Sequence, residues 1–167
     1  MASYDHQVAS DDNTQEGKYL TFALGKETYA LEICYVTEII GIQEITPIPD
    51  MPDYVCGVIN LRGKVLPVMD ARKRFKMPER HYDARTCIVV IHASESTIGL
   101  VVDTVNEVLE ISADMVDKAA QFNSNKKGRF IKGLGKVNNQ VKIILNAETL
   151  IFDQGMEKAA DREGSIV

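Results

Sequence analysis

The chain has 167 residues, of which 45% are hydrophobic and 26% charged, so it can bury a substantial core and has the composition of an ordinary globular protein. Its net charge of -5 comes from acidic residues near the two ends, which leaves the segment between them neutral. A neutral body argues against nucleic acid as the main partner.

The two ends of the chain differ from its body. Residues 1–16 contain four acids and no Lys or Arg, and they lack hydrophobic periodicity, so we predict a disordered acidic tail. A second tail is expected over 154–167. No signal peptide and no apolar run of membrane-spanning length is visible, which predicts a cytoplasmic protein that does not insert into a membrane.

Strand signals dominate the first half of the body, where apolar and polar residues alternate. The apolar spacing around Val36 then lengthens, which predicts one or two helical turns. Three prolines keep 44–54 extended, and a tight turn is expected at Arg62-Gly63. Asp70 can cap a short helix that reaches about Lys76. The predicted strands of this half are 18–24, 28–33, 55–61 and 64–69.

The second half shows the same order of elements. Ser112 can cap a short turn at 113–116, and the polar segment 118–128 is expected to be a loop. Asn146 can cap a final short helix through Phe152. The predicted strands of this half are 87–91, 97–102, 129–137 and 140–145.

The two halves, about 18–78 and 85–152, are a weak repeat. Residues 30–42 line up with 99–111 at an offset of 69, and Gly57 lines up with Gly133 at an offset of 76. Many short strands with brief helices at equivalent places predict an all-β fold of two small barrels packed together, and whether strands cross between them stays open. The clearest difference between the copies is Arg62-Gly63, which becomes Asn138-Asn139.

Motifs for chemistry are missing from the sequence. The histidines are not at metal-ligand spacing with another ligand, and no nucleophile or phosphate-binding motif is complete. Asp103, an acid among apolar residues, is interpreted as a turn or cap residue satisfied by backbone N–H groups. The basic stretch 72–85 is interpreted as a solvated face, and the three cysteines as small buried hydrophobes. We therefore predict no enzyme, no cofactor and no metal.

One run carries a specific resemblance. Residues 57–72 contain Asn60-Leu61-Arg62-Gly63, then an apolar residue, Pro67, two apolar residues and Asp70. This run resembles the core signature of the CheW family, the adaptor proteins of bacterial chemotaxis. The resemblance spans about 17–153 and leaves no room for a kinase module. It implies two SH3-like five-stranded β-barrels packed together, a few short helices and no catalytic residues.

The resemblance also implies partners. A CheW-like adaptor couples the cytoplasmic tip of transmembrane chemoreceptors to the regulatory domain of the histidine kinase CheA, and it is recruited to receptor arrays at the membrane. By position, the kinase-facing residues are Val36, Glu38, Ile39 and Gly57. The receptor-facing residues are Arg62, Cys87, Ile88, Val105 and Val108. Phe122 lies where a second, ring-completing contact is expected.

Structural interpretations compete with these roles. The pairs Val36/Val105 and Ile39/Val108 match between the copies, so they are expected to be structural first, with at most one member of each exposed. Gly57 is expected to serve a backbone demand such as a bulge. The alternative functions are an adaptor of another receptor–kinase pathway, such as surface motility, and an SH3-like RNA-binding barrel, for which the chain lacks basic residues interleaved with aromatics.

Overall fold

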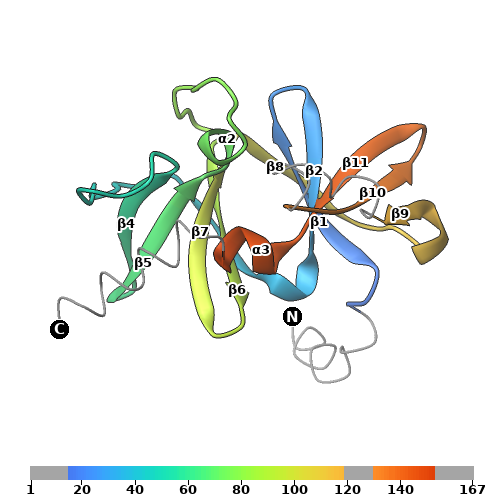
Figure 1. Ribbon diagram of the computed structural model, residues 1–167, viewed down its shortest axis with the longest axis horizontal. Helices are drawn as coiled ribbons and strands as arrows, with labels where there is room; N and C mark the ends of the chain where they lie inside the picture. Colours follow the sequence, from blue (N-terminus) through green and yellow to red (C-terminus); the bar gives the residue numbers. More distant parts are fainter. Residues whose placement is uncertain (1–14, 119–129, 153–167) are drawn as a thin grey trace.

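The computed structural model of the protein describes residues 15–118 and 130–152. These residues form mainly β-strands, arranged in two sheets that lie side by side (Figure 1). The predicted ring-interface residue Phe122 lies outside the described residues, as do most of the two predicted tails.

The strands have three to seven residues in sheet A and six or seven in sheet B. Sheet A has the order β8-β1-β2-β11-β10-β9, and sheet B has the order β3-β6-β7-β5-β4. The strands of sheet A are β1 (Lys18–Leu24), β2 (Glu27–Glu32), β8 (Thr104–Glu110), β9 (Val116–Lys118), β10 (Ile131–Val137) and β11 (Gln140–Leu145). The strands of sheet B are β3 (Val36–Gly41), β4 (Val55–Leu61), β5 (Lys64–Asp70), β6 (Cys87–Ala93) and β7 (Ser96–Val102).

Short helices follow equivalent strands in the two repeats. Helix α2 (Ala71–Arg74) follows β5, and α3 (Ala147–Phe152) follows β11. Both predicted caps are confirmed, because the Asp70 carboxylate accepts a hydrogen bond from the Lys73 N–H and Asn146 Oδ1 accepts one from the Thr149 N–H. Helix α3 leaves sheet A but packs against β6 and β7 of sheet B, so it helps to join the sheets.

Three local predictions are confirmed only in part. Only the 3₁₀ turn η1 (Ile33–Tyr35) is helical near Val36, which instead starts strand β3. The predicted turn at 113–116 is present as the 3₁₀ turn η2 (Ala113–Met115), but the Ser112 side chain makes no capping hydrogen bond. The short strand β9 follows where only a turn and a loop were expected, and it gives sheet A a sixth strand.

Neither sheet is built from one copy of the repeat alone. The two copies have exchanged their first hairpins, β1–β2 and β6–β7. Sheet A combines β1 and β2 of the first copy with strands of the second, and sheet B combines β6 and β7 of the second copy with strands of the first. The exchange is symmetric in register. Val68 pairs with Gly99 in sheet B and Ile144 pairs with Ala30 in sheet A, as the offsets of 76 and 69 require.

Two clusters of buried apolar residues hold the sheets. One lies between the sheets and includes Leu20, Phe22 and Leu31 from sheet A with Val89, Ile91 and Leu100 from sheet B. The other is formed within sheet B by Ile59, Leu66, Val68, Ile88, Val90 and Val101. Strands β6 and β7 supply residues to both clusters, which explains why their sequences are nearly continuous apolar runs instead of alternating ones.

Candidate protein-binding site

Strand β3, at one edge of sheet B, carries three of the predicted kinase-facing residues. A bulge interrupts its pairing with β6, where Val36 lies opposite Ile91 and Glu38 lies opposite Val90. Val36 packs against the cluster between the sheets, whereas Ile39 is 42% exposed. Among the described residues no strand pairs with the outer edge of β3, and Ile39 exposes an apolar side chain, so β3 offers both backbone and side-chain contacts to a partner.

Gly57 is required by the local backbone conformation, as the repeat predicted. It lies at a bulge between β4 and β5 with φ of +144°, and a Cβ atom there would lie 2.0 Å from the carbonyl oxygen of Thr46. Gly133 occupies the equivalent bulge between β10 and β11, where a Cβ atom would lie 2.7 Å from the Asp117 carbonyl oxygen. The glycine lets residue 46 approach β4, and its contribution to any partner surface is therefore through shape.

The turn between β4 and β5 presents Arg62. Both Arg62 and Gly63 have positive φ, 50° and 86°, as do Asn138 and Asn139 in the equivalent turn. This geometry favours Asn and Gly, so an arginine at the first position is held at a conformational cost. The Arg62 side chain is 68% exposed, and its guanidinium pairs with the Glu38 carboxylate on β3, the opposite edge strand of the sheet. The pair joins a residue of the predicted receptor-facing set to one of the predicted kinase-facing set.

The remaining predicted receptor-facing residues divide between the sheets. Cys87 and Ile88 are on β6 in sheet B, and Val105 and Val108 are on β8 in sheet A. Ile88 is fully buried, so its side chain supports the surface from beneath. Cys87 and Val105 are half-buried against the cluster between the sheets, and Val108 is 51% exposed.

The expectation of at most one exposed member per matched pair is wrong for Ile39 and Val108. Both side chains are exposed, at 42% and 51%. Exposed apolar side chains on equivalent strands of the two sheets have no packing role to explain them, and such positions commonly mark contact surfaces. Val36 and Val105 are both half-buried, in agreement with their mainly structural interpretation.

An ion cluster that the sequence analysis missed lies between the sheets. The Asp103 carboxylate accepts hydrogen bonds from Arg72 Nε at 2.8 Å, Arg72 Nη2 at 2.7 Å and Arg80 Nη1 at 3.0 Å. It also accepts one from the Gly25 N–H at 2.8 Å. Backbone N–H groups alone were expected, and the arginines were assigned to a solvated face. The signal available in the sequence was an acid in apolar surroundings in a chain that also contains a dense basic stretch.

These contacts set the charge state of Asp103. Burial by itself would raise its pKa, but the hydrogen bonds from Arg72, Gly25 and Arg80 outweigh burial and lower the pKa to about 2. The side chains of Asp103 and Arg72 are only 8% and 15% exposed. The charge pair is therefore shielded from solvent and stays ionised at neutral pH.

Arg74 also departs from the expected solvated face. It is buried, and its guanidinium carbon lies 4.1 Å from the centre of the Tyr54 ring and 4.3 Å from that of the Phe130 ring. Stacking between two aromatic rings suits the planar guanidinium. This arginine is thus part of the packing between α2 and its surroundings.

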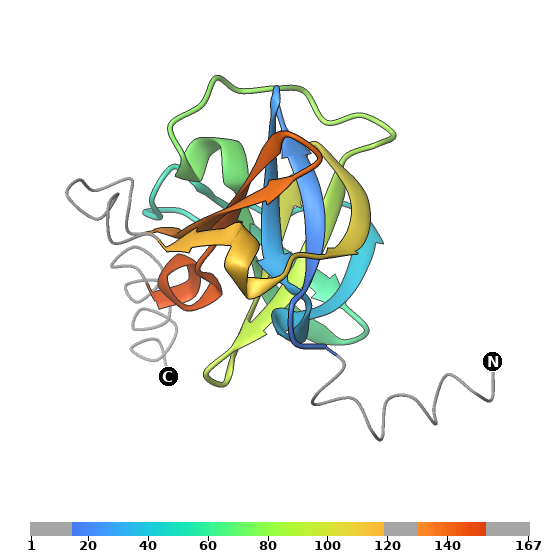
Figure 2. The same cartoon turned by 90° about the vertical axis from the view of Figure 1, so that its right-hand side faces the viewer.

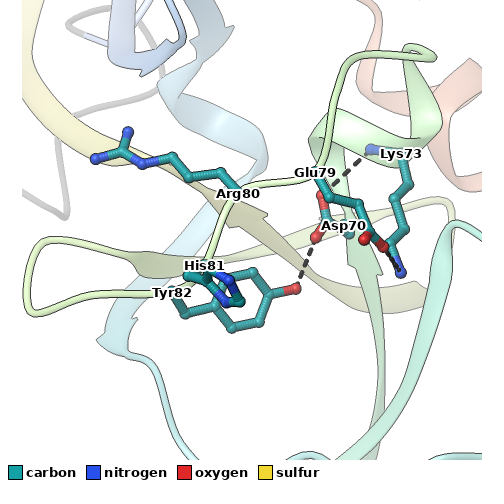
Figure 3. A pocket seen from close by; sticks show the side chains of 6 residues that line it. All are labelled: Asp70, Lys73, Glu79, Arg80, His81 and Tyr82. Atoms are coloured by element: carbon teal, nitrogen blue, oxygen red, sulfur yellow. Dashed lines mark hydrogen bonds and ion pairs between the residues drawn. The ribbon is translucent and has the colours of Figure 1, made fainter.

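A shallow hollow lies beside α2, under the segment 78–86 that leads to β6 (Figure 3). Tyr82 donates a hydrogen bond of 2.6 Å to Asp70, and its hydroxyl lies 3.5 Å from Cys56 Sγ. Burial, followed by the bond to Asp70, raises the pKa of Tyr82. Lys73 forms an ion pair with Glu79 in the same hollow, so the charges of these two side chains balance each other. The arrangement fastens the segment to the sheet.

The cysteines are less buried than predicted. Cys34 is exposed and Cys56 and Cys87 are half-buried, and all three are free thiols. Within the residues that the structure describes, no group of three His, Cys, Asp or Glu side chains is placed to hold a metal ion. In the same part of the chain, no helix has the length and apolar character needed to cross a membrane.

The fold and these surfaces define a class of protein. In the part of the chain that the structure describes, two packed β-domains display an edge strand with no partner on its outer side, exposed apolar side chains and an arginine that the turn does not favour, which are the properties of a protein-binding scaffold. Residues 18–154 match the family model described as CheW-like domain. The chain belongs to the CheW family.

Curated relatives and a solved structure agree with this assignment. The chain is 33% identical over 139 residues to chemotaxis protein CheW of Klebsiella aerogenes, covering 83% of this chain and 84% of that protein. It is 30% identical over 142 residues to chemotaxis protein CheW of Bacillus subtilis, covering 85% and 91%. The crystal structure of the scaffolding protein TtCheW from Thermoanaerobacter tengcongensis superposes with a TM-score of 0.76 at 31% identity, covering 83% and 94%.

Two predictions are thereby confirmed. The fold is all-β, with two SH3-like domains packed together and a few short helices. The function, that of an adaptor between chemoreceptors and the kinase CheA in chemotaxis signalling, is confirmed at the level of the family.

Proposed function

We propose that this protein acts without catalysis, as a cytoplasmic scaffold that is recruited to receptor arrays and holds the CheA regulatory domain and the receptor tip in fixed geometry. The kinase would contact the surface of Val36, Glu38, Ile39 and Gly57, which all lie on β3 and β4 of sheet B. The receptor tip would contact Arg62, Cys87, Val105 and Val108, with Ile88 supporting them. Phe122 would contribute to a further, ring-completing contact.

The observation that most supports this proposal is the unfavourable backbone conformation of the exposed residue Arg62. An arginine in the left-handed region costs about 1 kcal/mol relative to the residues that the turn favours, and the equivalent turn of the same chain uses Asn138 instead. Its partner Glu38 leaves the guanidinium largely exposed. A helical receptor tip offers carboxylates and C-terminal carbonyls, which a forked guanidinium can bind.

The test is co-sedimentation with purified CheA and a receptor cytoplasmic fragment, using Arg62→Ala, Arg62→Asn and the control Arg85→Ala. We expect both Arg62 variants to weaken receptor binding by about tenfold, because exposed arginines at protein contacts are frequent hot spots. The Arg85 side chain is exposed and is not among the proposed contact residues; its backbone carbonyl, which accepts a hydrogen bond from Cys87 Sγ, is kept in Arg85→Ala, so this variant should behave as wild type.

The asparagine variant separates function from folding. It installs the residue of the equivalent turn, so its melting temperature should be at least that of wild type while receptor binding is weakened. Wild-type receptor binding by Arg62→Asn would contradict the assignment of Arg62. Loss of receptor binding by Arg85→Ala to the same degree would show that a general loss of positive charge explains the result.

A further inference from the structure

The chain passes between the two sheets at two places within the described residues. It leaves sheet A for sheet B through η1, between β2 and β3, and it returns at Asp103, between β7 and β8. Figure 2, which turns the molecule by 90°, looks along its long axis, with the strands of sheet A in front of those of sheet B. These two crossovers are the covalent connections between the two sheets in the described residues.

The two crossovers differ in chemistry although the repeat makes them equivalent. At the offset of 69, the residue that corresponds to Asp103 is Cys34, which is exposed and uncharged. Asp103, by contrast, is buried and bound by two arginines. The first crossover also has a charge pair, but its members, Glu32 on β2 and Lys132 on β10, both belong to sheet A. A charge cluster that involves both sheets at only one of two equivalent crossovers is not required by the shared fold, so it needs a separate explanation.

Asp103 bonds to both sheets at once. From sheet A, the Gly25 N–H in the β1–β2 turn donates to its carboxylate, and its own N–H donates to the Ala23 carbonyl oxygen. From the side of sheet B, Arg72 on α2 and Arg80 on the segment before β6 donate to the same carboxylate. Arg72 is itself fixed by the Pro78 carbonyl oxygen, which accepts from Nη1 at 2.9 Å.

We infer that Asp103 is a positioning residue that fixes the angle between the two sheets and thereby completes the receptor-binding surface. Asp103 directly precedes β8, the strand that carries Val105 and Val108. The kinase-facing residues all lie in sheet B, whereas the receptor-facing residues are divided between sheet B and β8 of sheet A. A change of the angle between the sheets therefore alters the second surface and leaves the first intact. The binding consequences rest on the proposed function, but the positioning role does not.

The experiment measures geometry and binding separately on the full chain. Backbone N–H residual dipolar couplings report whether one alignment tensor describes both sheets. Asp103→Asn removes the charge, Asp103→Glu keeps it, and Asp114→Asn is the control, because it removes an exposed acid in η2 outside this cluster. Affinities for the CheA regulatory domain and for the receptor cytoplasmic fragment are measured on the same samples.

We expect one tensor for wild type and for Asp114→Asn, two distinct tensors for Asp103→Asn, and partial recovery in Asp103→Glu. Receptor affinity of Asp103→Asn should fall by about fivefold or more, with kinase affinity within about twofold of wild type. If Asp103→Asn does not fold, Arg80→Gln removes one arm of the cluster and should show a smaller change of the same kind, because Arg80 is 45% exposed.

A single, unchanged tensor in Asp103→Asn would overturn the inference, as would an equal loss of affinity for both partners. If wild type bound neither partner, the proposed function would be wrong, while the dipolar couplings would still decide whether Asp103 holds the sheets in place.

Discussion

Asp103 illustrates how one side chain can serve both folding and assembly. Its carboxylate takes four hydrogen bonds, three from arginine nitrogens and one from a backbone N–H. Removing one partner from such a cluster is costly, because the remaining charges stay buried without compensation. The stability of the native state should therefore depend on the ionisation of this one acid.

The pH dependence follows from the low pKa of Asp103. Its pKa is about 2 in the native state, compared with about 3.9 in an unfolded chain, so ionised Asp103 contributes roughly 2.5 kcal/mol above pH 5. Because the native pKa is the lower one, that contribution is lost as pH falls, and about half is gone by pH 3. The unfolding free energy of wild type minus that of Asp103→Asn, measured in urea, should shrink accordingly between pH 7 and pH 3.

Asp114→Asn is the matched control for this measurement and should remain within about 0.5 kcal/mol of wild type at either pH. A difference between wild type and Asp103→Asn that is constant with pH would show that hydrogen bonding to the neutral group, and not charge, explains the effect.

Among the elements, the glycine-containing bulges decide how the sheets curve. At Gly57 the Thr46 carbonyl oxygen occupies the place of a side chain, and at Gly133 the Asp117 carbonyl oxygen approaches almost as closely. Thr46 also pairs with Val58 as an isolated bridge, so the close approach is part of the hydrogen bonding of β4. Bulges at equivalent positions in both copies mark a shared requirement of the fold.

Alanine substitutions at these glycines should lower the unfolding free energy to different degrees, because the atoms around each Cβ position differ. Gly57→Ala places a Cβ atom against backbone at positive φ, so we expect a loss of at least about 3 kcal/mol, and Gly133→Ala should lose about 2 kcal/mol. Gly41, on β3, has no atom within 4 Å of a Cβ position, so Gly41→Ala should be within about 0.5 kcal/mol of wild type. Urea midpoints measure all three. Equal midpoints for Gly57→Ala and Gly41→Ala would contradict the steric argument.

Most strands could be predicted because alternation of apolar and polar residues is a local signal. The error at β3 has a physical cause. The bulge between Val36 and Glu38 inserts one extra residue, so Val36 packs toward sheet A while Ile40, four residues later, packs into the cluster within sheet B. Such a change of face imitates the spacing of a helix, and no local pattern distinguishes the two.

The candidate site could be predicted only in part. Arg62 stood out because the copies differ there, and the structure adds the cost of its backbone conformation. The partners of Asp103 lie 31 and 23 residues away in sequence, and a contact over such a distance leaves no periodicity. The burial of Ile88 likewise depends on side chains of β4, β5 and β7 within sheet B, which is a property of the tertiary arrangement.

In the whole molecule, the exchange of hairpins makes each sequence half dependent on the other. The β1–β2 hairpin finds its neighbours β8 and β11 only in the second half, and β6 and β7 find β3 and β5 only in the first. An isolated hairpin is marginal in water, and the apolar cluster between the sheets draws on both halves. Cooperative folding should therefore require the complete repeat.

Fragments 1–84 and 85–167 test this dependence. The division falls in the exposed segment between α2 and β6, so it leaves every strand intact. Each fragment alone should lack a cooperative thermal transition, because its hairpins have lost their pairing partners, whereas an equimolar mixture should recover the circular dichroism spectrum and a single transition that rises with concentration. A first fragment carrying Gly57→Ala is the matched control and should complement poorly, since the β4–β5 bulge cannot form. Cooperative melting of fragment 1–84 by itself would mean that the first half closes its own barrel, and the exchanged arrangement would then not be required for folding.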